Sequence, residues 1–240
     1  MNRILDKIKE EALNVLFPKI CLNCGKEGDY VCGECSVFIG EAALICPVCN
    51  KSNFTGQRHL HCSARSGLDG LVNIWEYEGI IKEVFKNIKY KRVSHMAPEF
   101  TAKAFEAIAK DTGRFQSFLS FLFSENTHIA YVPMYKKKEK QRGFNQAKLI
   151  AEEMGKISGK KVVSLLIKTK ETSSQTKLDK EARSKNLKDA FEYCEKTILP
   201  SQIVLVDDIW TTGATMRECC RILKKAGVQK IWGFTLVRTV

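Results

Sequence analysis

The strongest constraint on the fold is the stretch from Ile203 to Thr215, which reads Ile-Val-Leu-Val-Asp-Asp-Ile-Trp-Thr-Thr-Gly-Ala-Thr. Four apolar, mostly β-branched residues lead directly into two carboxylates. This pattern is typical of a buried parallel strand whose carboxyl end opens onto a site. A short polar loop and an amphipathic run from Met216 to Ala226 follow. The sequence therefore predicts a strand, a loop and a helix as the centre of an α/β domain.

The loop after the two acids predicts an anion site. It consists of Thr211, Thr212, Gly213, Ala214 and Thr215. Small side chains and a glycine let backbone NH groups approach an anion, and a helix N-terminus adds the positive end of its dipole. Asp207 and Asp208 would repel that anion, so they need another group on the same ligand. Adjacent ribose hydroxyls suit them because both can donate to carboxylate oxygens. We expect a ribose phosphate.

A Walker B strand is the main alternative for the acidic pair, and it requires a P-loop elsewhere in the chain. The nearest candidate runs from Gly155 to Lys161. It has one residue too few between its glycines, and Lys161 stands where Ser or Thr is needed. The ribose phosphate interpretation is therefore favoured.

Cysteine spacing predicts two metal sites in the N-terminal part. Four pairs with two intervening residues follow one another: Cys21 and Cys24, Cys32 and Cys35, Cys46 and Cys49, His59 and Cys62. This spacing lets a tight turn present two ligands to one Zn2+. The simplest assignment gives the first two pairs to one ion and the last two to another, although interleaved pairing is open. Because protein would fill every position, we expect two structural zinc ions in a double zinc ribbon. A disulfide framework suits a secreted chain better.

The composition of the chain limits its class without choosing a partner. With 240 residues and 44% apolar content, it can bury a sizeable core and carry a second small module. Its net charge of +12 favours polyanions such as pyrophosphate, nucleotides or nucleic acid, although solubility alone would also account for it. No apolar run has the length of a membrane span and no signal peptide pattern opens the chain. We expect a cytoplasmic protein without membrane insertion.

The remaining chain alternates helical and strand patterns, which indicates an α/β fold with a largely parallel sheet. The expected elements are an amphipathic packing helix over Met1 to Phe17, a strand over Leu71 to Tyr77, a helix over Ile80 to Ile88, helical residues 97–123 divided near Gly113, and a strand over Ile129 to Val132. We place the domain boundary between residues 68 and 69. Residues 1–68 form the helix and the zinc ribbon, and residues 69–240 form the α/β domain.

Three further features concern the ligand. A basic loop follows Pro133, and its Lys136, Lys137 and Arg142 are expected to bind the pyrophosphate end of a ligand. The polar segment from Lys168 to Lys177 is either an exposed loop or a lid that excludes water. Trp210 could cap the site, stack on a ligand or pack, and packing or capping is favoured.

The sequence resembles two related groups of proteins. The stretch from Ile203 to Thr215 resembles the phosphoribosyl-pyrophosphate (PRPP) loop of type I phosphoribosyltransferases. The run from Arg142 to Gln146, with Val132 and Pro133 upstream, resembles the ComF family of competence proteins. The residues that match this family's mobile loop and the segment after it are Thr172, Gln175, Leu178, Glu181, Arg183, Asn186, Ala190 and Phe191. The zinc ribbon is the family's usual companion, although many relatives have cysteines where this chain has His59.

The resemblance implies a type I phosphoribosyltransferase-like fold, with Asp207 and Asp208 as catalytic residues. It also implies PRPP or ribose-5-phosphate as ligand, Mg2+ bound with PRPP, and pentosyl transfer to an unknown acceptor. A role in natural transformation follows by analogy, with single-stranded DNA and competence-machinery proteins such as a helicase or a recombination mediator as partners. A non-catalytic PRPP sensor or DNA-binding adaptor that keeps the same site is the alternative.

Overall fold

A computed structural model gives the structure of the chain and describes residues 18–62, 67–90, 94–171, 187, 189–195 and 199–239. Several expectations lie outside the described residues. They are the helix over Met1 to Phe17, residues 172–177 of the polar segment, and the matching positions Thr172, Gln175, Leu178, Glu181, Arg183 and Asn186.

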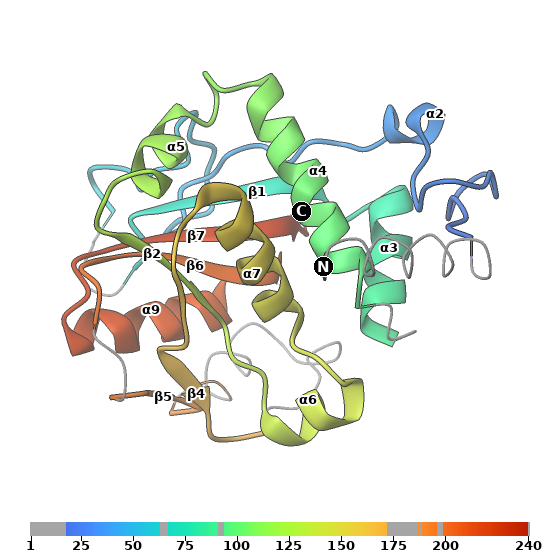
Figure 1. Ribbon diagram of the computed structural model, residues 1–240. Helices are drawn as coiled ribbons and strands as arrows, with labels where there is room; N and C mark the ends of the chain where they lie inside the picture. Colours follow the sequence, from blue (N-terminus) through green and yellow to red (C-terminus); the bar gives the residue numbers. More distant parts are fainter. Residues whose placement is uncertain are drawn as a thin grey trace, which may run out of the picture.

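Five parallel strands form the central sheet, in the order β1-β7-β6-β2-β3 (Figure 1). They are β1 (Gly70–Glu76), β2 (Thr127–Tyr131), β3 (Val162–Val163), β6 (Gln202–Trp210) and β7 (Lys230–Arg238). A separate antiparallel pair joins β4 (Leu166–Lys168) to β5 (Phe191–Tyr193). The predicted fold class, a mainly parallel sheet flanked by helices, is confirmed.

Helices cover both faces of the sheet (Figure 1). One face carries α3 (Gly79–Tyr90), α4 (Met96–Lys110), α5 (Gln116–Leu122) and α7 (Gln146–Ser158), and the other carries α9 (Ala214–Ala226). The break expected near Gly113 separates α4 from α5. In the part of the chain that is described, no helix combines the length and the apolar character needed to cross a membrane.

Alternation along β6 divides the core into two halves. Val204 and Val206 belong to the cluster under α4, α5 and α7, whereas Ile203 and Leu205 pack with α9. Successive side chains of a strand point to opposite faces, so a continuous apolar run is what a strand covered on both faces requires. The β-branched run in the sequence is explained by this double burial.

Strand β6 continues beyond its apolar run, which the sequence pattern did not predict. Parallel pairing with β7 joins Asp207 to Thr235 and Trp210 to Arg238, so the two acids lie within the strand. The backbone NH of Thr239 also donates to the carbonyl oxygen of Trp210 at 2.9 Å. The acids are thus held by the ladder and are followed, three residues later, by the loop.

The basic stretch expected as a loop is a short helix, α6 (Lys136–Arg142). Lys, Glu, Gln and Arg all have high helix propensity, and the segment has no β-branched residue or glycine to oppose it. Gly143 ends the helix with a φ of 89°, in the left-handed region that glycine adopts freely.

The N-terminal segment runs along the outer edge of β1. The NH of Ala42 donates to Ile74 O at 2.9 Å, the NH of Glu76 donates to Gly40 O at 2.9 Å, and the NH of Leu71 donates to Gly56 O at 2.8 Å. The chain around residues 40–42 and 56–57 therefore pairs with the edge of the sheet from outside. The domain boundary between residues 68 and 69 stays a prediction.

Gly70 provides a test of the core. A Cβ atom at this position would lie 2.5 Å from the Trp232 ring, which is buried against Phe118 and Phe121. We expect Gly70→Ala to lower the free energy of unfolding by about 1 to 3 kcal/mol through overpacking. Thermal and urea unfolding measure the loss.

Gly113→Ala is the matched control, because the nearest atom to its Cβ is Asp111 Oδ1 at 3.9 Å. It should leave the unfolding transition unchanged or raise it slightly. Equal stability of the two variants would contradict the packing of Gly70 against Trp232.

Candidate functional site

The chain changes direction between β2 and β6. After β2 it passes through α6 and α7 to β3 on one side, and after β6 it passes through α9 to β7 on the other. Parallel sheets bind ligands at the carboxyl ends of strands where successive connections diverge in this way. The NH of Val132, just after β2, donates to Val206 O at 2.9 Å, directly before the acids. The basic helix and the acidic pair therefore lie at the carboxyl ends of neighbouring strands.

The two acids of β6 are half-buried. The NH of Asp208 donates to Asp207 Oδ1 at 2.9 Å. Because Leu205 packs with α9, strand alternation places Asp207 on the same side of the sheet. The negative charge of Asp207 also acts on Cys219, a buried residue of α9.

Lys168 was expected only as the first residue of a polar loop or lid, but it belongs to a strand and lies near the acids. It ends β4, and its ammonium lies 5.1 Å from the centre of the Phe191 ring on β5. Burial and the like charge of Lys138 lower the pKa of Lys168, while Cys219 and Asp207 act in the opposite direction. The side chain therefore lies within electrostatic reach of the acidic strand. No local pattern marked it, because its position follows from the antiparallel pairing of β4 with β5.

The loop from Thr211 to Thr215 is shaped by its glycine. Gly213 has a φ of 74°, and a Cβ atom there would lie 2.3 Å from Trp210 Cζ2. It is also the N-cap of α9 and offers no side chain to the first NH groups of that helix. These groups and the helix dipole favour an anion at the loop. Any larger residue at Gly213 would disturb Trp210 as well as the loop.

Trp210 packs rather than projecting into solvent, in agreement with one of its expected roles. It is only 2% exposed, and the guanidinium of Arg217 lies 5.3 Å from the centre of its ring. A cavity of about 360 Å3 opens beside it, lined by Ile45, Asn50, Trp210, Thr211, Thr212, Arg238 and Thr239. The space next to the loop is therefore enclosed in part by the N-terminal segment.

The run from Arg142 to Gln146 connects α6 to α7 and anchors both. Asn145 caps α7 by accepting from the NH of Ala147 at 3.0 Å, and its Nδ2 donates to Val132 O at 3.0 Å. Arg142 Nη1 donates to Gln146 Oε1 at 2.9 Å. The motif thereby fixes the basic helix to the end of β2.

The predicted pyrophosphate ligands lie on α6. Lys136 and Lys137 are exposed at its start, whereas Arg142 is partly buried at its end. Lys138 is close enough to Lys168 to affect its pKa. Their role toward an anion stays a prediction.

The first metal set gathers Cys21, Cys24, Cys32 and Cys35, whose sulfur atoms lie within 4.8 Å of one another. Cys32 is the N-cap of α2 (Gly33–Ser36), and Cys35 lies within this short helix. Burial opposes ionisation of Cys21, but the backbone NH groups of Cys24 and Cys32 outweigh it and lower the pKa of this thiol to about 6. One thiolate is thus favoured before any metal binds.

The second metal set gathers Cys46, Cys49, His59 and Cys62, again with ligand atoms within 4.8 Å of one another. His59 Nδ1 lies 3.3 Å from Cys49 Sγ, and its Nε2 lies 3.2 Å from Ser52 O. Such a contact on the far nitrogen holds a histidine ligand in orientation. Burial opposes ionisation of Cys46, but the NH groups of Cys49 and His59 lower its pKa to about 6.

Both sets match the simple assignment rather than the interleaved one. The structure leaves all ten cysteines as free thiols. Four soft donors in a compact group suit a tetrahedral structural ion, and zinc is consistent with this donor chemistry. His61 stacks on the His59 ring with centroids 5.2 Å apart and is not part of the set.

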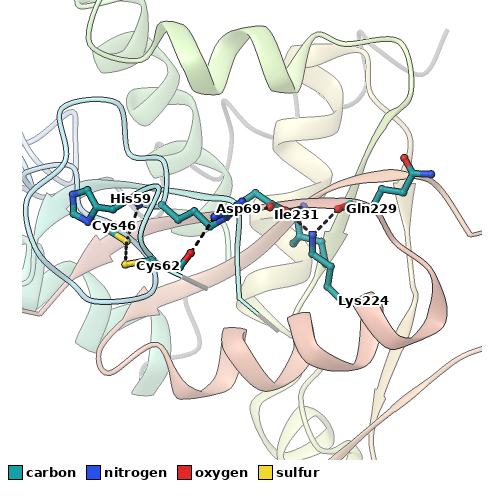
Figure 2. A network of polar contacts seen from close by, with 8 residues as sticks. Cys46, His59, Cys62, Asp69, Lys224, Gln229 and Ile231 are labelled. Atoms are coloured by element: carbon teal, nitrogen blue, oxygen red, sulfur yellow. Dashed lines mark hydrogen bonds and ion pairs between the residues drawn. The ribbon is translucent and has the colours of Figure 1, made fainter. Parts of the chain in front are cut away.

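A chain of polar contacts connects the second set to the sheet and to α9 (Figure 2). Arg58 Nη1 donates to Cys62 O at 3.0 Å, and Arg58 Nε lies 3.8 Å from Asp69 Oδ1. Asp69 Oδ2 accepts from Lys224 Nζ at 2.7 Å and from the NH of Ile231 at 2.8 Å. The far end of α9 is therefore tied to the metal segment through two ion pairs.

Comparisons with known proteins show which sequences this chain resembles. Residues 140–239 match the family model described as "Phosphoribosyl transferase domain". "Competence protein F" of Haemophilus influenzae is 35% identical over 110 residues, 44% of this chain and 48% of that protein, so the alignment spans about half of its length.

Two other relatives align over most of the chain. "Competence protein ComFC" of Bacillus subtilis is 26% identical over 239 residues, which cover 95% of this chain and 88% of that protein. "DNA utilization protein YhgH" of Escherichia coli K12 is 24% identical over 217 residues, which cover 88% and 91% respectively.

The fold, the loop after β6 and the family match define a chain with a phosphoribosyltransferase domain. The chain is a homologue of the ComF, ComFC and YhgH proteins. Its N-terminal part contains two cysteine-rich clusters that could form zinc ribbons. The resemblance found in the sequence is confirmed.

Metal content tests the two clusters separately. We expect about two zinc ions per chain in the purified protein, and about one in either Cys24→Ser or Cys49→Ser, because each variant removes one ligand of one set. Elemental analysis by mass spectrometry measures the ratio. A metal-free protein prepared without chelators would contradict the prediction, as would loss of both ions from each single variant.

Proposed function

We propose that the chain binds PRPP or a ribose-5-phosphate ligand at the carboxyl edge of β6, in the cytoplasm. The carrying observation is the direct succession of a half-buried acidic pair, a left-handed glycine and the N-terminus of α9 at the point where the strand connections diverge. In this proposal the loop from Thr211 to Thr215 binds the 5'-phosphate, and Asp207 and Asp208 accept hydrogen bonds from the ribose diol.

As an enzyme, the protein would transfer the pentosyl group to a nitrogen nucleophile. The nucleophile forms a bond to C1 of the ribose, the bond from C1 to the pyrophosphate oxygen breaks, and its electron pair leaves with pyrophosphate. The acidic pair would stabilise positive charge that develops on the ribose. The cations Lys136, Lys137, Arg142 and Lys168 would stabilise the departing anion, and Mg2+ bound with PRPP would neutralise part of its charge.

A non-catalytic PRPP sensor or DNA-handling adaptor is the second candidate. It is favoured by the net charge of +12 and by relatives whose names refer to competence and DNA utilization. Release of pyrophosphate from PRPP with candidate nitrogen bases decides between the two. Turnover supports the transferase, whereas saturable PRPP binding without pyrophosphate release supports the sensor.

The diol assignment is tested with ribose-5-phosphate and 2-deoxyribose-5-phosphate. Calorimetric titration of the unmodified protein should show a preference for the first ligand. Asp207→Asn combined with Asp208→Asn should abolish that preference, since each lost charge-assisted hydrogen bond costs about 1.5 to 3 kcal/mol. The single variants show how much each carboxylate contributes to the preference.

Asp111→Asn is the control for a lost carboxylate, because it lies after α4 and binds the NH of Arg114. It should keep the full preference for ribose-5-phosphate. A double variant of Asp207 and Asp208 that still discriminates between the sugars would remove the diol from these acids.

Binding of single-stranded DNA should be weak and strongly dependent on salt. We expect the affinity for an oligonucleotide to fall by about tenfold or more between roughly 50 and 200 mM salt, because counterions are released from neutralised phosphates. Lys136→Gln with Lys137→Gln on α6 should reduce the salt slope, whereas Lys110→Gln at the end of α4 should not. Fluorescence anisotropy measures both. A salt-independent affinity would exclude the electrostatic account.

A further inference from the structure

One arginine of α9 connects the loop from Thr211 to Thr215, called the anion loop below, to the second metal set. Arg217 Nη1 donates to Thr212 O at 3.0 Å, inside the loop. Its Nε and Nη2 donate to Pro47 O at 3.0 and 2.8 Å, and Nη2 also lies 3.3 Å from Val48 O. The backbone NH of Arg217 donates to Gly213 O at 2.9 Å. A single side chain therefore bridges the loop and a segment 170 residues away in the sequence.

The contacts require an arginine. A guanidinium holds five N–H donors in a rigid fork, whereas a lysine offers a single ammonium on a flexible stem. The fork of Arg217 also lies against the Trp210 ring, which limits its rotation. The side chain is thus fixed by packing as well as by its acceptors.

The acceptors belong to a turn that the metal ligands enclose. Pro47 and Val48 are the two residues between Cys46 and Cys49. A metal bound by both cysteines fixes the direction of the carbonyl groups between them, because it closes the turn. Without the metal, the turn loses this closure, and the acceptors of Arg217 lose their fixed position.

The two metal turns share a left-handed residue directly after their second cysteine, which is Gly25 in the first turn and Asn50 in the second. In the first, the NH of Gly25 donates to Cys21 O at 2.9 Å with a φ of 77°. In the second, the NH of Asn50 donates to Cys46 O at 2.9 Å with a φ of 61°. Asparagine tolerates this left-handed conformation, and here its Oδ1 accepts from Arg217 Nη2 at 3.0 Å. The second turn therefore carries an additional acceptor that a glycine lacks.

The other end of α9 is connected to the same metal set. Lys224 pairs with Asp69 at 2.7 Å, Asp69 faces Arg58, and Arg58 donates to the carbonyl oxygen of the ligand Cys62 (Figure 2). Both ligand pairs of the second set thus reach the helix whose N-terminus forms the anion loop.

We propose that Arg217 is a positioning residue that sets the conformation of the Thr211 to Thr215 loop, so that metal in the second set controls the affinity of the loop for a ribose phosphate. The proposal rests on the function proposed above for that loop. Arg217 transmits the shape of the metal turn to Thr212 O and Gly213 O without contacting the ligand. The first metal set has no such connection in the described part of the chain.

Substitutions on α9 test the positioning role. Arg217→Ala and Arg217→Lys should both weaken ribose-5-phosphate binding by about tenfold, since neither keeps the fork. Arg221→Ala is the matched control one turn further along, because Arg221 pairs with Glu218 on the same helix. It should bind as the unmodified protein does. Asn50→Gly keeps the turn but removes one acceptor, and it should give a smaller loss than Arg217→Ala.

Metal variants test the coupling itself. Cys49→Ser should weaken ribose-5-phosphate binding about as much as Arg217→Ala, and the double variant should be no weaker than either, because both act through one connection. Cys24→Ser, which disturbs the first set, should cause a much smaller loss. By linkage, ribose-5-phosphate should tighten zinc at the second set by the same factor, which competition with a chelator measures.

Hydrogen exchange of the ligand-free protein separates this proposal from the proposed function. Faster exchange of residues 211–217 in Arg217→Ala and Cys49→Ser, but not in Arg221→Ala or Cys24→Ser, supports the connection. An unmodified protein that binds no ribose-5-phosphate would refute the proposed function while these exchange differences remained. Unchanged exchange and affinity in Arg217→Ala would overturn the positioning role.

Discussion

Parallel pairing of β6 with β7 is the constraint on which the site depends. The ladder with β7 continues through Asp207 and reaches Trp210, beyond the last pairing with β2 at Val206, so the acidic pair belongs to a strand held by β7 rather than to a free loop. Trp210 is buried where the ladder ends, and it leaves room for only a glycine three residues later. Strand pairing, aromatic burial and the start of α9 therefore determine the path of the loop together.

The sequence predicts the local parts of this arrangement because their causes are local. The apolar run before Asp207 needs burial on both faces, and the four ligand pairs have a spacing that suits one turn each. Gly213 was predicted to permit close approach of an anion, and its steric conflict with Trp210 adds a second reason for glycine. These features depend on residues that lie close to each other in the sequence.

Features that depend on distant segments could not be predicted from the sequence. Lys168 reaches the acidic strand because β4 pairs with β5, and Arg217 finds its acceptors in the second metal turn.

The helical form of α6 was missed because its charges suggested a ligand loop, although its helix propensities favoured a helix. Charge indicated what the segment could bind, and propensity decided its conformation.

The N-terminal segment also protects the sheet. An open parallel sheet ends in a strand whose unpaired NH and carbonyl groups can recruit a strand from another molecule. In this chain the outer edge of β1 is occupied by backbone groups of Gly40, Ala42 and Gly56. Without these backbone groups the edge would be open to pairing with a strand of another molecule. The cysteine-rich segment thus covers a sheet edge in addition to holding the two clusters of metal ligands.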